Sequence, residues 1–279
     1  MLFRSSNKCA FCHNSWYGLP YRCNSINRVI TEIRYLNQIY GIGLISFYDD
    51  DLFMNKPRIN LFCHRLIESE IPIVWSAMSR VDNLDIETLK LAKQAGCIQI
   101  QFGFESGSQR MLDSFNKKIT IEQSVEAIRM CHEVGIPVWG FFMIGCPNET
   151  VEDVRMTQQF IKNNPMEMSV VSLASPFPGT KWWDWCKERG LIPEHIDWSD
   201  FILNSFDYKA LSKHIFACDT IPVAQLVELY KEMQPVIPKG MKRVDAKWLI
   251  DMCTQHPIKS INLATRISLW SRYLDRIKK

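Results

Sequence analysis

Apolar residues follow two alternating patterns along the chain, helical spacing in some segments and short continuous runs in others. In residues 25–40 the apolar positions lie three or four residues apart, which predicts an amphipathic helix. Residues 41–48 form a short apolar run behind a glycine, which predicts a buried strand. The alternation continues, with strands predicted at 71–78, 97–104, 136–145 and 167–175 and helices at 55–69, 85–96, 120–135, 150–164 and 180–190.

The order of these elements predicts an α/β fold. Strand–helix units recur about 30 to 40 residues apart, and strands separated by helices of this length run parallel with right-handed crossovers. Thr120 and Gln123 have the spacing of a capping box, which supports a helix start at residue 120. An open doubly wound sheet and a barrel both fit this order. Only "MLFR" is available for a strand before the first cysteines, so we expect a clipped first strand.

The alternation ends near residue 195. We therefore expect a core of residues 1–195 and a smaller helical appendage of residues 196–279, with helices near 222–234, 245–255 and 261–277. The last helix carries apolar residues beside Arg266, Arg272 and Arg276, so it could make weak contact with an anionic membrane surface. A docked helix with a solvated basic face is the interpretation that we favour.

Composition and charge narrow the cellular setting. The formal net charge is +3, which is too small to indicate a nucleic-acid partner. The ten cysteines are spread along the chain without the density of a secreted disulfide framework. The start "MLFRSSNK" has no apolar run of signal-peptide length, and we find no apolar stretch long enough to span a membrane. We expect a cytoplasmic protein with mostly buried thiols.

Cys9 and Cys12 form the only Cys-x-x-Cys pair in the sequence, within "SSNKCAFCHN". Four chemistries use such a pair: thiol redox exchange, zinc binding, haem attachment and iron–sulfur ligation. Haem attachment normally accompanies export, for which there is no signal. A zinc site needs a second pair, and a redox pair needs a helix start in a small redox fold.

Polar and small residues follow several of the predicted strands. They include "DDDLF" (49–53), "SRVDNLD" (79–85), "ESGSQRML" (105–112), "GCPNET" (145–150) and "PFPGT" (176–180). In a parallel α/β barrel, the loops behind the carboxyl ends of the strands lie at one mouth and carry the active site. These five segments and "CAFCHN" should therefore meet at that mouth.

Seven segments in this order resemble the radical S-adenosylmethionine (SAM) enzymes. The resemblance covers residues 5 to about 190 and is closest to the branch that often carries a cobalamin-binding domain. The segments are "NKCAFC", "YRCNSINRVITEI", "ISFYDDDLF", "WSAMSRVDNLD", "AGCIQIQFGFESGSQRML", "GIPVWGFFMIGCPNET" and "SPFPGTKWW". The resemblance implies a partial (β/α)6 TIM-like barrel, with a clipped first strand here and a small helical region at the C-terminus.

The resemblance also implies a 4Fe–4S cluster held by three cysteines in Cys-x-x-x-Cys-x-x-Cys spacing. Cys9 and Cys12 match the last two, but the first position is Ser5, whose hydroxyl is a harder and less readily ionised ligand than a thiol. Cys23 is the one nearby thiol that could replace it. In the family, SAM chelates the fourth iron, and an electron from the cluster splits SAM to a 5′-deoxyadenosyl radical.

Further site residues are implied by the same resemblance. Asp49, Asp50 or Asp51 would bind the SAM ammonium group, Glu105 and Ser106 its ribose and amino acid end. Gly145 would let the backbone approach the nucleoside, and Phe11 would lie against adenine or the cluster. Arg80 could meet the SAM carboxylate or pair with Asp82, and we favour the salt bridge. Pro178 and Gly179 could shape the loop near the adenine edge or form a simple turn. We expect a helix-start charge at Glu149 and core packing of Trp182, Trp183 and Trp185.

The function expected from the resemblance is reductive cleavage of SAM for hydrogen abstraction from a substrate or for methyl transfer. The substrate is a small molecule that the sequence does not identify, and the reductant would be a protein such as a flavodoxin or ferredoxin. Cobalamin would be held by a separate or missing domain of roughly 150 residues. A non-catalytic or truncated radical-SAM-like protein, impaired at Ser5, is the alternative.

Overall fold

The protein is described by a computed structural model that covers residues 8–13, 23–196, 198 and 214–233. Its centre is a parallel sheet of five strands in the order β1-β2-β3-β4-β5. The strands are β1 (Leu44–Phe47), β2 (Val74–Ser79), β3 (Cys97–Glu105), β4 (Val138–Ile144) and β5 (Met168–Leu173). Spatial order follows chain order, so the α/β prediction is confirmed. The predicted clipped first strand, Ser5 and the predicted helices at 245–255 and 261–277 lie outside the described residues.

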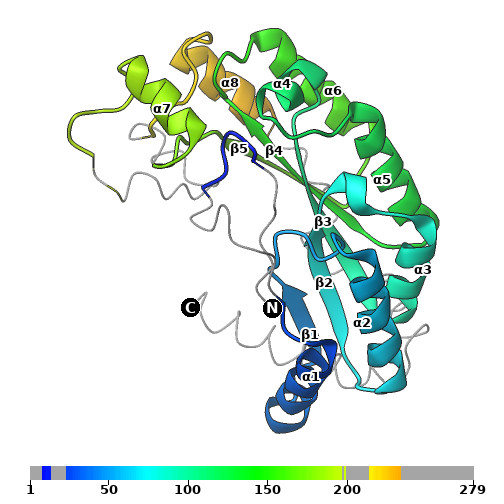
Figure 1. Ribbon diagram of the computed structural model, residues 1–279. Coiled ribbons are helices and arrows are strands. Elements are labelled where there is room, and N and C mark those ends of the chain that lie inside the picture. The colour runs from blue at the N-terminus through cyan, green and yellow to red at the C-terminus, as the bar shows by residue number, and fades with distance from the viewer. Residues whose placement is uncertain (1–7, 14–22, 197, 199–213, 234–279) are drawn as a thin grey trace, which may run out of the picture.

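The helices between the strands line one side of the curved sheet (Figure 1). They are α2 (Lys56–Glu68), α3 (Ile86–Gln94), α4 (Gln109–Ser114), α5 (Ile121–Glu133) and α6 (Val151–Asn163). The others are α1 (Ile26–Tyr40), α7 (Lys181–Glu188) and α8 (Val223–Met233). The sequence analysis missed the short 3-10 helix Val81–Asn83, because it is too short to show a helical period.

Helix starts depend on side-chain caps. Thr120 and Gln123 form the predicted capping box at α5, and Thr150 and Asp153 form another at α6. Each cap accepts hydrogen bonds from backbone N–H groups that have no partner inside the helix. These caps fix where each helix begins after the loop at the end of the preceding strand.

Strand β1 departs from the expectation of a buried strand. Leu44 is 49% exposed, and Phe47 is the one fully buried residue of the strand. Within the described residues, β1 is hydrogen-bonded to β2 alone, so it is an edge strand. The apolar run of residues 41–48 therefore predicted the strand correctly but its burial wrongly. Burial of a strand depends on what covers its two faces and its edge.

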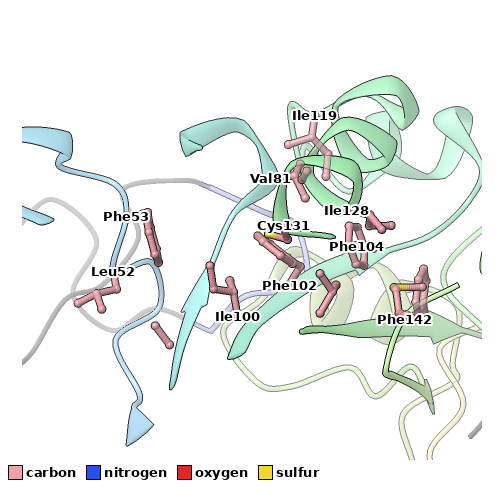
Figure 2. Close-up of a cluster of buried hydrophobic side chains, with 14 of the residues drawn as sticks. Leu52, Phe53, Val81, Ile100, Phe102, Phe104, Ile119, Ile128, Cys131 and Phe142 are labelled. Atoms are coloured by element: carbon pink, nitrogen blue, oxygen red, sulfur yellow. The ribbon is translucent and has the colours of Figure 1, made fainter. Parts of the chain in front are cut away.

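The core lies between the sheet and the helices that line it (Figure 2). Phe104 of β3 stacks on Phe142 of β4 with ring centroids 5.5 Å apart, and Phe160 of α6 lies 5.9 Å from each ring. At the other end of the sheet, Trp75 contacts Phe62 at 5.5 Å. Aromatic pairs of this kind add to the stabilisation from burial, so they fix the helices against the strands.

Helix α8 packs into this same core. Leu226, Leu229, Tyr230 and Met233 are all buried, and they join one continuous apolar cluster with the strands. Residues 214–233 therefore extend the core beyond the division expected at residue 195. None of the helices in the described ranges is long and apolar enough to cross a membrane.

Gly145 shows how closely α8 approaches. Its φ is 77°, and a β-carbon at this position would lie 2.7 Å from the Cδ2 atom of Leu226. Gly190 also has a positive φ, of 68°, but nothing lies within 4 Å of its β-carbon position. Both glycines relieve backbone strain, but only Gly145 also makes room for a neighbouring side chain.

We predict that Gly145→Ala lowers the free energy of unfolding by about 2–3 kcal/mol, because backbone strain and overpacking act together. Gly190→Ala, the matched control, should cost about 1 kcal/mol from strain alone. Urea unfolding of both variants measures the difference. Equal losses would contradict the packing of Leu226 against Gly145, and Leu226→Ala added to Gly145→Ala should remove the excess.

Candidate active site

The polar residues singled out in the sequence meet at the carboxyl edge of the sheet. Asp49–Asp51 follow β1, Arg80 follows β2, Glu105 ends β3 and Gly145 follows β4. All five strands run parallel, so these positions share one edge. The expected common mouth is therefore confirmed.

Glu105 adopts a left-handed backbone conformation with φ of 68°. The β3–β4 register shifts between Gly103 and Glu105, which is the signature of a β-bulge. The bulge turns the carboxylate back across Gly103, where a β-carbon would collide with Glu105 Oε1. A non-glycine residue in this conformation lowers the free energy of unfolding by on the order of 1 kcal/mol. The position of the Glu105 carboxylate therefore comes with a loss of stability.

The carboxylate of Glu105 is paired with Lys117. The Nζ atom donates to Oε1 at 2.7 Å, and the two side chains are 11% and 9% exposed. Lys117 was not among the predicted site residues. The sequence carries no signal that distinguishes it from the adjacent Lys118, which is exposed. Only the fold, through the turn after α4, places one lysine inside and the other outside.

Cys9 and Cys12 lie in a turn in which the Cys12 N–H donates to the Cys9 carbonyl at 3.2 Å. Two backbone hydrogen bonds of Ala10 hold this turn in place, one to Phe115 and one to Trp182. Its N–H donates to the Phe115 carbonyl at 2.8 Å, and its carbonyl accepts from the Trp182 N–H at 3.3 Å. The cysteine loop is thus fixed between the end of α4 and the start of α7.

Phe11 packs inside this turn. Its ring centroid lies 5.9 Å from that of Phe115 and 5.4 Å from that of Trp182, with Lys117 Nζ 5.8 Å from its centre. Trp182 is buried, as expected for core packing, whereas Trp183 and Trp185 are only half-buried. Phe11 is itself half-buried, so part of its surface remains open.

The pKa values of the Cys9 and Cys12 thiols shift in opposite directions. The pKa of Cys9 falls to about 6, first because the Cys12 thiol donates a hydrogen bond to it and then because Lys117 and Arg80 are nearby cations. The pKa of Cys12 rises, because it keeps the shared proton and is partly buried. A thiolate beside positive charge is a soft, anionic ligand, which fits iron–sulfur ligation. Ligation by Cys9 and Cys12 stays a prediction, and the pair would account for two of the three cysteines in the family motif.

Asp51 and Arg80 brace the neighbouring loops. Asp51 is buried, which raises its pKa, and it accepts from the Asn83 amide at 2.5 Å and the Ser79 hydroxyl at 3.2 Å. Arg80 pairs with Asp82 at 2.9 Å, which confirms the expected salt bridge. Asp49 is also buried and Asp50 is exposed, so the three aspartates differ in what they can reach.

The comparisons with known proteins agree with this geometry. The family model described as the radical SAM superfamily matches residues 4–161, which is more than half of the 279 residues. The chain belongs to the radical SAM superfamily. Enzymes of this family use a 4Fe–4S cluster and SAM, so the resemblance noted in the sequence is confirmed.

Three curated relatives of this radical SAM chain are named as methyltransferases or as a cyclase. An uncharacterized methyltransferase of Pyrococcus horikoshii is 36% identical over 66% of the chain and 40% of its own length. The anaerobic magnesium-protoporphyrin IX monomethyl ester cyclase of Rubrivivax gelatinosus is 28% identical over 61% of the chain and 31% of its length. The bacteriochlorophyllide d C-12(1)-methyltransferase of Chlorobaculum tepidum is 28% identical, over 86% of the chain and 51% of its length.

Solved structures share the fold. The radical SAM methyltransferase TsrM from Kitasatospora setae, with cobalamin and a [4Fe–4S] cluster bound, matches with a TM-score of 0.60 at 19% identity, over 66% of this chain and 35% of TsrM. Coproporphyrinogen III oxidase from Escherichia coli matches with a TM-score of 0.57 at 13% identity, over 84% of this chain and 50% of the oxidase. The chain thus spans about half or less of the length of each of these five proteins.

Two predicted site residues of this radical SAM chain contact protein groups. The Ser106 hydroxyl lies 3.0 Å from the Thr157 hydroxyl and accepts from the Ser108 N–H at 3.1 Å, inside the protein. Gly145 receives Leu226 on its side-chain face, and its N–H donates to Glu149 Oε2 at 2.5 Å. These contacts use the Ser106 hydroxyl and the Gly145 N–H to hold the loops in place.

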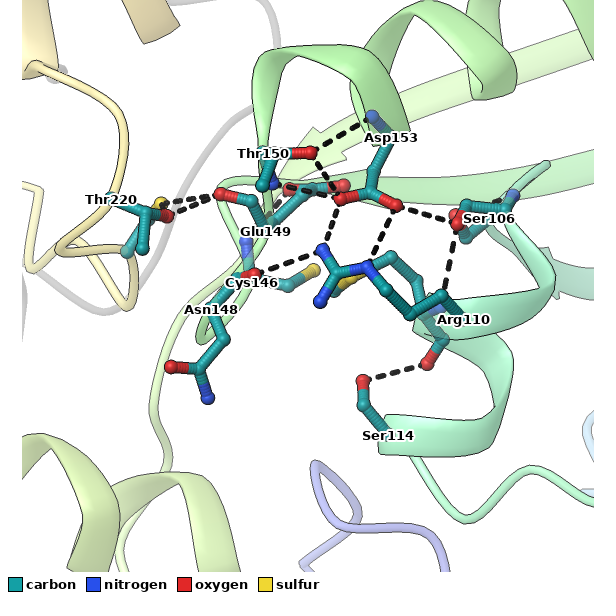
Figure 3. Close-up of polar contacts among 12 residues, drawn as sticks. Ser106, Arg110, Ser114, Cys146, Asn148, Glu149, Thr150, Asp153 and Thr220 are labelled. Atoms are coloured by element: carbon teal, nitrogen blue, oxygen red, sulfur yellow. Dashed lines mark hydrogen bonds and ion pairs between the residues drawn. The ribbon is translucent and has the colours of Figure 1, made fainter.

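Glu149, expected as a helix-start charge, is buried, and its polar contacts are drawn in Figure 3. Its Oε2 accepts the N–H groups of Gly145 and Cys146, and its carbonyl accepts the hydroxyl of Thr220, which joins the β4 loop to the segment before α8. Among the described residues, Oε1 has no hydrogen-bond partner. Burial raises the pKa of Glu149 to about 8. The neighbouring Asp153 instead pairs with Arg110, which helps to hold its pKa low.

The turn at Pro178 and Gly179 contacts the cysteine loop. A ring nitrogen of His13 lies 2.7 Å from the Pro178 carbonyl, which identifies the hydrogen bond that holds the turn. Gly179 has a φ of 78°, and a β-carbon there would lie 3.1 Å from His13 Nδ1. The predicted turn therefore also contacts His13, the residue that follows Cys12.

We predict that Glu149→Gln gains stability relative to the wild type as pH rises. The unfolded carboxyl ionises near its ordinary pKa, whereas the folded one stays protonated up to about 8, so wild-type stability falls across this interval. Glutamine keeps the acceptor and does not titrate. The relative gain should be about 1–3 kcal/mol between about pH 5 and pH 8, measured by urea unfolding. The exposed Glu152→Gln is the control, and the same pH trend in both variants would contradict the assignment.

Proposed function

We propose that the chain is the radical SAM part of an enzyme that cleaves SAM reductively, in the service of methyl transfer or another radical modification of a small molecule. The observation that carries this proposal is the cysteine turn facing Lys117, Arg80 and Glu105 at the mouth of a radical SAM sheet. The similarity to two methyltransferases and a cyclase supports this range of chemistry. The non-catalytic alternative is not favoured by these comparisons.

Each residue at the mouth has a role in this proposal. Cys9 and Cys12 would hold two irons, and Ser5 stands where the family has its third ligand. A 4Fe–4S cluster bound there would supply the electron that cleaves SAM. The carboxylate of Glu105 accepts hydrogen bonds from the ribose hydroxyls, since an anionic acceptor binds paired hydroxyls about twice as strongly as a neutral one. The open face of Phe11 excludes water from the reacting group.

The three aspartates after β1 stay candidates for binding the SAM ammonium group, because all of them follow the same strand. Asp51 also accepts hydrogen bonds from Ser79 and Asn83. Ser106 and Gly145 contribute by fixing the backbone on which Glu105 and the nucleoside-facing loop depend.

The partners follow from this chemistry. A low-potential protein such as a flavodoxin or ferredoxin would deliver the electron. Cobalamin, where the reaction uses it, would be bound outside the described residues. We place the chain in the cytoplasm, because the nine cysteines in the described residues are not joined in disulfides. Cell fractionation that recovers the protein from an oxidising compartment would contradict this placement.

We predict that Ser5→Cys raises iron and sulfide content after anaerobic reconstitution and increases formation of 5′-deoxyadenosine. A thiolate is a softer ligand for iron than a hydroxyl, so the unchanged chain should bind a substoichiometric cluster. Ser6→Cys, one position away, is the matched control and should change neither quantity. Cys9→Ala and Cys12→Ala should abolish iron uptake.

The opposite result would point to another third ligand. If the unchanged chain already binds a full cluster and cleaves SAM as fast as Ser5→Cys, then Ser5 itself or Cys23 completes the site. Cys23→Ala separates these two cases, because only a ligand role for Cys23 predicts loss of iron. No iron uptake by either chain would contradict the proposed function.

We predict that Glu105→Gln weakens SAM binding to the reconstituted protein about tenfold to a hundredfold. Loss of one charged, buried hydrogen bond costs on the order of 2–3 kcal/mol. Glu68→Gln, on an exposed helix end, is the control. Calorimetric titration that finds equal affinities for wild type and Glu105→Gln would remove Glu105 from the SAM site.

A further inference from the structure

We propose that Lys117 is a positioning residue whose fixed positive charge faces the cysteine loop and raises the reduction potential of the iron–sulfur group bound there. This inference rests on the proposed function and extends it to a residue outside the family motifs discussed above. It is carried by the position of one buried ammonium group, which pairs with the Glu105 carboxylate and lies 5.8 Å from the centre of the Phe11 ring in the cysteine loop.

Two hydrogen bonds fix the backbone of Lys117, one at its carbonyl group and one at its N–H group. Its carbonyl accepts from the Arg80 guanidinium at 2.8 Å, and its N–H donates to the Leu112 carbonyl at 3.1 Å. The residues on either side, Asn116 and Lys118, have φ of 53° and 57°. The backbone therefore makes a tight turn that carries the Lys117 side chain inward while Lys118 stays outside.

The ammonium end is held as firmly. Nζ lies 2.7 Å from Glu105 Oε1 and 5.8 Å from the centre of the Phe11 ring, which belongs to the cysteine loop. Gly103 leaves the space into which both charged groups fit, since a β-carbon there would lie 3.2 Å from Nζ. The Asn116 side-chain amide also donates to the Lys8 carbonyl at 2.8 Å, so the turn of Lys117 and the start of the cysteine loop are joined.

Three charged groups act on the Cys9 thiol. Lys117 and Arg80 are cations, and Glu105 is an anion. Arg80 already forms an ion pair with Asp82, which offsets its charge. Reduction adds negative charge to an iron–sulfur group, so a nearby cation favours the reduced form and a nearby anion opposes it. Lys117 and Glu105 should thus shift the potential in opposite directions.

The test is a redox titration of the reconstituted full chain without SAM, followed by electron paramagnetic resonance. Lys117→Gln keeps a hydrogen-bond donor for Glu105 but removes the charge. Its midpoint potential should be more negative by an amount equivalent to about a tenfold change in the ratio of reduced to oxidised cluster, about 59 mV for one electron. Lys118→Gln is the matched exposed control, and both it and Lys117→Arg should keep the wild-type potential.

The Glu105→Gln variant distinguishes two causes of a changed midpoint potential, the loss of a charge and a loosened cysteine loop. The charge argument predicts a more positive potential for Glu105→Gln, whereas a loosened, wetter loop would shift the potentials of Lys117→Gln and Glu105→Gln in the same direction. If Lys117→Gln fails to fold by circular dichroism, Glu105→Gln carries the test alone, through the sign of its shift. Unchanged potentials, or shifts of the same sign, overturn the inference.

Failure of the proposed function gives a different result. If neither the unchanged chain nor Ser5→Cys takes up iron, the proposed function fails and this inference fails with it. If the unchanged chain takes up iron but Lys117→Gln and Lys118→Gln have equal potentials, the proposed function stands and only the role of Lys117 is excluded.

Discussion

The common direction of the five strands is the constraint on which the rest of the molecule depends. Because β1 to β5 are parallel, every loop that follows a strand emerges at the same edge. Asp51, Arg80, Glu105 and Gly145 are far apart in the chain, but this direction makes them neighbours. The helices cover one side of the sheet (Figure 1). Polar groups at the carboxyl edge, such as Asp51, Arg80 and Glu105, are therefore buried.

Burial makes the polar groups of this edge depend on one another. A buried carboxylate without a partner is costly, and three here meet that cost differently. Glu105 pairs with Lys117, Asp153 with Arg110, and Glu149 accepts two backbone N–H groups with its pKa raised to about 8. The arrangement in Figure 3 is therefore a scaffold that connects β3, β4 and the segment before α8, whereas the Glu105 pair faces the cysteine loop.

Local patterns in the sequence predicted the elements well, because spacing and caps are local properties. The capping box at Thr120 and the order of the strands were both readable in this way. What could not be predicted was set by contacts between distant segments. The fit of Leu226 against Gly145 and the inward turn of Lys117 have no local signature, and neither has the exposure of Leu44 on β1. The contact between the hydroxyl groups of Ser106 and Thr157 likewise joins segments that are far apart in the chain.

Gly103 has a consequence for how this sequence can vary. The Glu105 carboxylate occupies the space that any β-carbon at position 103 would need, with the ammonium of Lys117 close behind it. In evolution, positions 103, 105 and 117 should therefore be inherited as one unit. A lineage that shortens residue 105 frees position 103 to acquire a side chain, and a return to glutamate is then blocked until the glycine is restored.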